Sequence, residues 1–306
     1  MEEKGQDDSV QEEQQYGDLE ERYKKYREIL KNLTIMSDIF MRNVLKKKEC
    51  TEYVIQTILN DRIHILDQTI QKDYKNLQGR SAIMDCVARD DRNRRINVEI
   101  QQEKEGASPK RARYHSGLMD MNTLNPGEDF DTLPDNYVIF ITKTDVLGLK
   151  KQIYHIDRRI RETGEVFGDD TYIVYVNAGM QDDTEVGSLV HDLHCRDAKD
   201  IYSKVLAQRV YELKETQEGI AVMCKEMDEI YNDGMNRGIE YERKNTERER
   251  DRADKERERA DRAEFASNNM MKLTTLLLKS DRVDDCLRAA NDVVYQQQLL
   301  KELGIA

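Results

Sequence analysis

The most informative pattern of apolar and polar positions lies between residues 81 and 102, where alternation with a period of two predicts a β-hairpin. If the turn is centred on Arg92, residues at equal distances from Arg92 face each other, and Asp85 lies opposite Glu99. One face then carries these two carboxylates and the amide of Asn97. The other face is wholly apolar and consists of Met84, Cys86, Ala88, Ile96, Val98 and Ile100. A shift by one residue would mix the two faces, so the pattern favours this register.

The segments around this hairpin predict an α/β fold. Apolar residues at intervals of three and four predict helices between residues 19 and 50, and Thr51 is suited to cap a further helix that ends at Leu59. After the hairpin, Ser108 followed by Pro109 is typical of a helix start. Further strands are expected at residues 67–77, 137–142, 153–156 and 171–176. This order predicts a mixed central sheet flanked by helices.

The C-terminal part of the chain is predicted to be helical throughout. Residues 186–231 keep the helical period, whereas residues 240–264 are mostly charged side chains of both signs at spacings that support a solvated helix. Gly234 and Gly238 predict a helix break before this charged stretch. We therefore expect four parts: a disordered acidic tail (1–20), an α/β domain (21–235), a charged helical spacer or weak coiled coil (236–266) and a C-terminal helical unit (267–306).

The charge balance is acidic, with a formal net charge of −12 over 306 residues. Most of it comes from the first 21 residues, which hold nine acidic side chains and one lysine. The remainder is close to neutral, so the composition does not exclude a nucleic-acid partner. The five cysteines are scattered and odd in number, and no apolar run has the length of a membrane span. These features favour a cytoplasmic protein without disulfides or a membrane partner.

The carboxylate pair is the sharpest candidate for chemistry. Two carboxylates that face each other repel unless a cation lies between them, and hard oxygen ligands suit Mg²⁺. Asp85 and Glu99 therefore suggest a metal site. The alternative is a pair of solvated charges on an exposed hairpin.

Several short motifs occur in an order that resembles a known family. They are DIFMRNVL (38–45), MDCVARD with INVEIQQ in the hairpin, PKRARYH (109–115), YHIDRRI (154–160), YIVYVNAG and LVHDLHC (189–195). Together they resemble the PD-(D/E)XK nuclease family transposases, which are related to the recombination-promoting nucleases, and they cover roughly residues 30–230.

This resemblance implies a restriction-endonuclease-like core and a Mg²⁺-dependent DNA endonuclease associated with transposition or recombination. By the same resemblance, Asp85 and Glu99 bind Mg²⁺, or Mn²⁺ in its place, and the carbonyl of Ile100 completes the site. An acidic residue from the first helices supplements such sites, and Glu52 is the first choice here, with Asp38 as the second.

Gln101 is a departure from the wider superfamily, which has a lysine at this position. Glutamine can hold a water molecule by hydrogen bonds but cannot act as an amine base. Glutamine is common in the transposase-like branch, so the resemblance stands. The departure leaves a second hypothesis open, in which the chain is a DNA-binding or protein-interaction module with weak or no catalytic activity.

Three cations in the predicted helix after the hairpin are candidates for DNA binding: Lys110, Arg111 and Arg113. The alternative is a solvated helix start, but cations there oppose the helix dipole, which favours a functional role. Arg111 also matches the position of the family's arginine.

A second cluster of possible metal ligands is weaker. His191, His194 and Cys195 share one face of a predicted helix, which suggests half a zinc site. No partner cluster completes it, so helix packing is the alternative, and Asp192 is expected to cap or pair rather than to catalyse. A purely helical scaffold is excluded because residues 85–101 do not fit a helical period. The C-terminal helices are expected to mediate homo-oligomerisation or DNA positioning.

Overall fold

The computed structural model describes residues 19–76 and 79–305. Residues 1–18 of the expected acidic tail lie outside this range, and residues 19 and 20 begin a helix that continues to residue 32. The chain divides into two compact units, one up to Ile230 and one from Tyr231 onward. None of the helices in the described ranges combines the length and apolar character of a membrane span.

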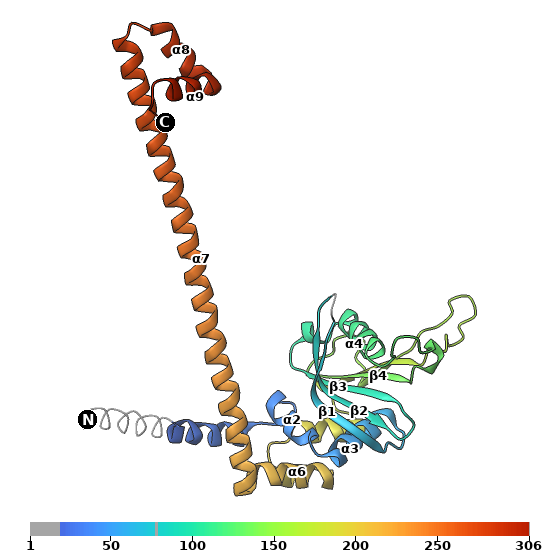
Figure 1. The fold of residues 1–306 in the computed structure, drawn as a ribbon. Coiled ribbons are helices and arrows are strands. Elements are labelled where there is room, and N and C mark those ends of the chain that lie inside the picture. Colours follow the sequence, from blue (N-terminus) through green and yellow to red (C-terminus); the bar gives the residue numbers. More distant parts are fainter. Residues whose placement is uncertain (1–18, 77–78, 306) are drawn as a thin grey trace, which may run out of the picture. The chain divides into compact units, whose positions relative to one another are not determined.

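The first unit is built on a six-stranded mixed sheet (Figure 1) with the order β1-β2-β3-β4-β6-β5. The strands are β1 (Ile65–Tyr74), β2 (Ala82–Asp90), β3 (Arg95–Gln101), β4 (Asn136–Thr142), β5 (Ile153–Ile156) and β6 (Thr171–Asn177). β1, β2 and β3 are antiparallel neighbours, β3, β4 and β6 run parallel, and β5 is antiparallel to β6. The predicted mixed sheet is therefore confirmed.

Helices cover both faces of the sheet. The helices with defined bounds are α2 (Asp38–Leu45), α3 (Lys48–Leu59), α4 (Pro109–Met121), α5 (Glu185–His194), α6 (Lys204–Glu215), α7 (Gln217–Lys279), α8 (Val283–Asn291) and α9 (Val293–Glu302). In β4, Ile139 and Ile141 join the core formed with α2, α3, α5 and α6, whereas Val138 and Phe140 join the core under α4. This alternation places α4 on the opposite face of the sheet from α2 and α3 (Figure 1).

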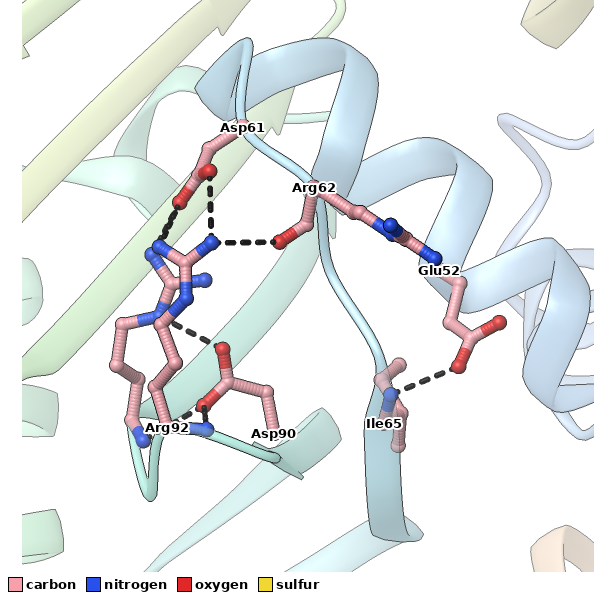
Figure 2. Close-up of polar contacts among 7 residues, drawn as sticks. Glu52, Asp61, Arg62, Ile65, Asp90 and Arg92 are labelled. Atoms are coloured by element: carbon pink, nitrogen blue, oxygen red, sulfur yellow. Dashed lines mark hydrogen bonds and ion pairs between the residues drawn. The ribbon is translucent and has the colours of Figure 1, made fainter.

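The predicted hairpin register is confirmed. Cys86 pairs with Val98 and Val87 pairs with Asn97, so the turn is centred on Arg92. The Asp90 carboxylate accepts hydrogen bonds from the backbone N–H groups of Arg92 and Arg94 at 3.1 and 2.8 Å. Figure 2 labels Asp90 and Arg92 in this turn. The turn is thus stabilised by a side chain of the hairpin itself, which fixes the pairing that follows.

The predicted apolar face of the hairpin is wrong at Met84. Asp85 is paired with neither β1 nor β3 in the strand registers. On either side of it, Cys86 joins the core with α2 and α3, whereas Met84 packs with Val87 in the core under α4. The alternation of β2 therefore reverses at Asp85, and a pattern with a strict period of two cannot predict such an irregularity.

Two predicted helix boundaries have different outcomes. Ser108 caps α4 as expected, because its side chain accepts a hydrogen bond from the backbone N–H of Arg111 at 3.3 Å. Thr51 is not a cap, since α3 already begins at Lys48 and the buried Thr51 hydroxyl donates to the carbonyl of Leu45 at 2.9 Å. The apolar period continues across this start, so it gave no signal of where the helix begins.

The predicted helix break at Gly234 and Gly238 is also wrong. Both glycines lie inside α7, which is continuous over 63 residues. A glycine inside a helix costs only about 1 kcal/mol relative to alanine, and the many Glu, Arg and Lys residues of the charged stretch after Gly238 favour a continuous helix. In the second unit, the end of α7 packs with α8 and α9 around a small core of Leu273, Leu277, Ala289 and Leu299.

Candidate metal centre

Asp85 and Glu99 meet where β2 and β3 stop pairing. The last regular pair before them is Cys86 with Val98. Beyond it, the backbone N–H of Asp85 donates to Glu99 Oε1 at 3.1 Å, and the backbone N–H of Ile100 donates to Asp85 Oδ2 at 3.2 Å. Each carboxylate therefore binds the backbone of the opposite strand. One oxygen of each side chain is fixed in this way, and the other oxygen is the candidate metal ligand.

Both carboxyl groups are held in surroundings that disfavour their negative charge. Burial and then the charge of Asp85 raise the pKa of Glu99 to about 8. Burial and then the charge of Asp38 raise the pKa of Asp85 to about 6. A nearby cation would relieve this repulsion, because it favours the charged forms of both acids. The oxygen donors and the raised pKa values together fit a hard divalent cation.

Glu99 Oε1 and Oε2 have different partners. Oε1 also accepts a hydrogen bond from Asn97 Nδ2 at 3.1 Å. Oε2 faces Gln101 Nε2 at 3.5 Å and Arg111 Nη2 at 3.7 Å, which are longer contacts. Glu99 Oε1 is therefore held by two short hydrogen bonds, from the Asp85 backbone and from Asn97, whereas Oε2 faces Gln101 and Arg111 at longer distances.

The Gln101 side chain lies against Gly106, whose lack of a side chain leaves room for it. A Cβ atom at Gly106, in the short 3-10 helix Lys104–Ala107, would lie 2.2 Å from Gln101 Oε1. No side chain larger than hydrogen fits there unless Gln101 moves. Gly106 thus shapes the surroundings of the carboxylates.

The structure does not bring Glu52 to the carboxylate pair. Its Oε1 accepts a hydrogen bond from the backbone N–H of Ile65 at 2.7 Å (Figure 2) and lies 3.3 Å from His64 Nδ1. Glu52 therefore caps the start of β1, and its role as the supplementary acid stays a prediction. The acid of the first helices whose charge acts on Asp85 is Asp38, at the first position of α2.

Asp38 is held at this position by two contacts. Its carboxylate forms an ion pair with Arg42, in which Arg42 Nε donates to Asp38 Oδ1 at 2.9 Å. The carbonyl of Met36, two residues earlier, accepts a hydrogen bond from the side chain of Gln102 at the end of β3. The second choice of the sequence, Asp38, is thus tied to the strand that carries Glu99.

The three candidate DNA-binding cations have different environments. Lys110 and Arg113 are exposed on α4. Arg111 is partly buried and turns toward the carboxylates, where its Nη2 lies 3.7 Å from Glu99 Oε2. The structure therefore separates one cation that faces the carboxylate pair from two that face solvent.

Two buried residues near Glu99 were not among the site residues predicted from sequence, although His115 was considered as a residue that lines the cleft or packs. Asn97 is completely buried, and His115 is 2% exposed, with its Nδ1 3.6 Å from Glu99 Oε1. Burial, followed by the charge of Arg111, lowers the pKa of His115 to about 4, so the imidazole is neutral. The signals were present: Asn97 shares the polar face of the hairpin, and His115 is four residues after Arg111 on one helical face.

The second candidate cluster is explained by packing contacts. Donor atoms of His191, Asp192 and Cys195 lie within 4.8 Å of one another, but His194 Nδ1 bonds the carbonyl of Val190 at 2.9 Å instead. The fully buried Asp192 carboxylate accepts the backbone N–H groups of Tyr202 and Ser203, which confirms its expected capping role.

Further contacts hold the other members of this cluster. The His191 ring stacks on Tyr202 with centroids 4.1 Å apart. Burial raises the pKa of the Cys195 thiol to about 11, which disfavours the thiolate that a metal requires. All five cysteines are free, as expected.

Comparison with known proteins gives one match. A sequence model of the family described as PD-(D/E)XK nuclease family transposase matches residues 38–195, slightly more than half of the chain. The matched segment begins at Asp38 and ends at Cys195, so it contains every residue of the candidate metal centre. No curated protein and no solved structure matches the chain.

Proposed function

The chain belongs to the PD-(D/E)XK nuclease family transposases, and from this we propose that it is a cytoplasmic, Mg²⁺-dependent DNA endonuclease that acts in transposition or recombination. The observation that carries the proposal is the reciprocal bonding of Asp85 and Glu99, which holds two carboxylates together where both have raised pKa values. Surroundings that raise the pKa values of two neighbouring carboxyl groups are typical of functional sites, and a cation between the two groups would favour both charged forms.

Asp85 and Glu99 would hold the metal, with the carbonyl of Ile100 and the carboxylate of Asp38 as further oxygen donors. This donor set suits Mg²⁺ and also accepts Mn²⁺. When bound, the cation would polarise the scissile phosphate and lower the pKa of the attacking water. Asp38 takes the role that the sequence had first suggested for Glu52.

The remaining residues would orient the substrate. The Gln101 amide, with two donors and an acceptor, would align a water molecule without removing its proton. The Arg111 guanidinium would bind an oxygen of the scissile phosphate and offset the charge that develops there. Lys110 and Arg113, exposed on the same helix, would contact neighbouring phosphates of the backbone.

The second candidate function is a DNA-binding or protein-interaction module without catalysis. It is favoured by one observation, the amide of Gln101 at the position of the superfamily's lysine. Both functions keep the same carboxylates and the same cations. They differ in whether Mg²⁺ leads to a broken phosphodiester bond.

The test is nicking of supercoiled plasmid DNA in the presence of Mg²⁺, and separately of Mn²⁺. We expect the wild type to convert supercoiled into open-circular DNA, EDTA to stop the reaction, and Asp85→Asn and Glu99→Gln to abolish it. Glu52→Gln is the matched control, because it neutralises a carboxylate outside the centre and should leave nicking intact. Wild-type protein that binds DNA without cutting it in either metal would support the second function.

We also propose that two copies associate through the C-terminal helices, since cutting both strands of a duplex requires two centres. Apolar side chains exposed on this unit, including Leu278, Val293 and Val294, support the proposal. Light scattering of the full chain should give the mass of a dimer. Polar substitutions at these three positions should then yield a monomer.

A further inference from the structure

His115 lies between two residues of the proposed active site. Arg111 Nε donates to His115 Nε2 at 3.3 Å, and His115 Nδ1 lies 3.6 Å from Glu99 Oε1. The ring is almost completely buried and packs against Phe140 with centroids 5.9 Å apart. A single imidazole therefore links α4, which carries the arginine, to β3, which carries the carboxylate.

The partner of Nε2 fixes the tautomer of this imidazole. A guanidinium group can only donate hydrogen bonds, so the Nε2 atom that accepts from Arg111 carries no proton. A neutral imidazole has one proton, which must then be on Nδ1. His115 Nδ1 lies 3.3 Å from Asn97 Nδ2 and 3.6 Å from Glu99 Oε1. Asn97 Nδ2 is itself a donor to Glu99 Oε1 at 3.1 Å, as is the Asp85 backbone N–H at 3.1 Å, so an Nδ1–H group points toward that oxygen beside the Asn97 amide.

These contacts restrain the orientation of both neighbours of His115, the Glu99 carboxylate and the Arg111 side chain. Glu99 Oε1 accepts hydrogen bonds from the Asp85 backbone and Asn97 and has a longer contact with His115 at 3.6 Å, which keeps Oε2 turned toward Gln101 and Arg111. On the other side, the bond to Nε2 restrains the Arg111 side chain, which is still 38% exposed and would otherwise sample several rotamers. An arginine held in one rotamer before substrate binds loses less entropy on binding a phosphate.

We propose that His115 is a positioning residue of the nuclease: as the Nδ1–H tautomer, it aims Arg111 at the scissile phosphate and Glu99 Oε2 at the metal. This inference rests on the proposed function. It assigns His115 no contact with the substrate and no proton transfer.

Three substitutions of His115 separate its contact with Arg111 from its contact with Glu99. His115→Phe keeps an aromatic ring against Phe140 but removes the hydrogen bond from Arg111 and the longer contact with Glu99. His115→Gln places an amide near the position of Nε2 and can still accept from Arg111, whereas His115→Asn places an amide near Nδ1 and can still donate to Glu99. Thermal denaturation of each variant establishes that it is folded before its activity is measured.

For His115→Phe we expect kcat for DNA cleavage to fall about 10- to 100-fold, the range usual for residues that orient a metal ligand. The KM for DNA should change little, since Lys110 and Arg113 are untouched. His115→Gln should recover part of the loss. In an Arg111→Ala background, His115→Phe should cause a clearly smaller loss than in the wild type, because one of its two partners is already absent. Equal losses in both backgrounds would overturn the link to Arg111.

A second readout does not depend on cleavage. Long-range ¹H–¹⁵N spectra of the imidazole groups distinguish the two neutral tautomers, and the signal of His115 is assigned by its absence in His115→Phe. We expect the Nδ1–H tautomer, and a changed Nε2 shift in Arg111→Ala. An Nε2–H tautomer would overturn the inference whether or not the protein cuts DNA. Failure of the wild type to cut DNA, with the expected tautomer present, would instead count against the proposed function.

Discussion

The backbone N–H of Asp85 donates a hydrogen bond to the side chain of Glu99 at 3.1 Å, so the chain itself holds the two carboxylates of the candidate centre together. The protein therefore does not need a cation to bring them near each other. Without a cation, the same arrangement keeps two acids in buried surroundings that disfavour their charged forms, and this should be visible in the pH dependence of the stability of the metal-free protein.

The stability of the metal-free protein should depend on pH in a defined direction. The pKa of Glu99 is raised from 4.5 to about 8, so the folded state binds this proton more tightly than the unfolded state does. The favourable contribution is present below pH 4.5 and is lost as the pH rises to about 8. Thermal denaturation in EDTA between pH 5 and 9 should show a falling Tm, and Mg²⁺ should restore it most at the alkaline end.

Glu99→Gln isolates this effect from other titrating groups. At pH 8 without metal it should be more stable than the wild type by at least about 1 kcal/mol, since one unit of pKa corresponds to about 1.4 kcal/mol. The difference should shrink toward pH 5, and Mg²⁺ should no longer raise the Tm of the variant. A wild-type protein that gains stability relative to Glu99→Gln as the pH rises would contradict the raised pKa.

Gly106 should matter through Gln101. A methyl group at Gly106 would lie 2.2 Å from Gln101 Oε1, so Gly106→Ala must displace that side chain. We expect Gly106→Ala to lower the rate of DNA cleavage about as much as Gln101→Ala, roughly tenfold. Mg²⁺ affinity, measured by calorimetry, should stay within about threefold of the wild type. A double variant much slower than either single one would show that Gly106 acts by another route.

The hairpin could be predicted from sequence because a turn and an alternating pattern gave the same register. The turn around Arg92 sets which residues face each other, and the apolar residues Ile96, Val98 and Ile100 set which face of β3 joins the core with α2 and α3. Met84 was misplaced because the alternation of β2 reverses at Asp85, the residue that exchanges bonds with the Glu99 strand. The prediction failed next to the carboxylates, where regular pairing ends.

The supplementary acid could not be chosen from sequence for a different reason. Helical spacing shows which residues share a face, but it does not show how that face is rotated toward a distant strand. Asp38 and Glu52 were both acidic residues in the first turn of an expected or observed helix. Only the bond from Ile65 to Glu52 and the charge of Asp38 beside Asp85 distinguish them.

Substitution of Glu52 should therefore lower the stability of the protein, whereas substitution of Asp38 should lower its Mg²⁺ affinity. Glu52→Ala leaves the buried backbone N–H of Ile65 without its acceptor and should cost about 1–3 kcal/mol of stability, with Mg²⁺ affinity unchanged. Asp38→Asn should weaken Mg²⁺ binding about tenfold and change stability little, because its ion pair with Arg42 is largely exposed. Chemical denaturation and calorimetry measure the two quantities. Weaker Mg²⁺ binding by Glu52→Ala alone would return the role to Glu52.

Substitution of the exposed cations of α4 should change how strongly salt weakens DNA binding. Lys110 and Arg113 are exposed, so their proposed contacts with phosphates depend on charge alone. Each alanine substitution should reduce the slope of log K for DNA binding against log[salt] by about one, and weaken binding to all sequences alike. Fluorescence anisotropy of a labelled duplex in Ca²⁺, at several salt concentrations, measures this slope without cleavage.

Arg111 should show a further effect, because its Nη2 lies 3.7 Å from Glu99 Oε2 while Lys110 and Arg113 point to solvent. Arg111→Ala should change the salt slope as the other two do, but should also lower cleavage at saturating DNA about 100-fold, because a donor near the scissile phosphate acts on the transition state. Lys110→Ala is the matched control: at saturating DNA its rate should equal that of the wild type. Equal rates for both variants at saturating DNA would mean that Arg111 binds the backbone and takes no part in the reaction.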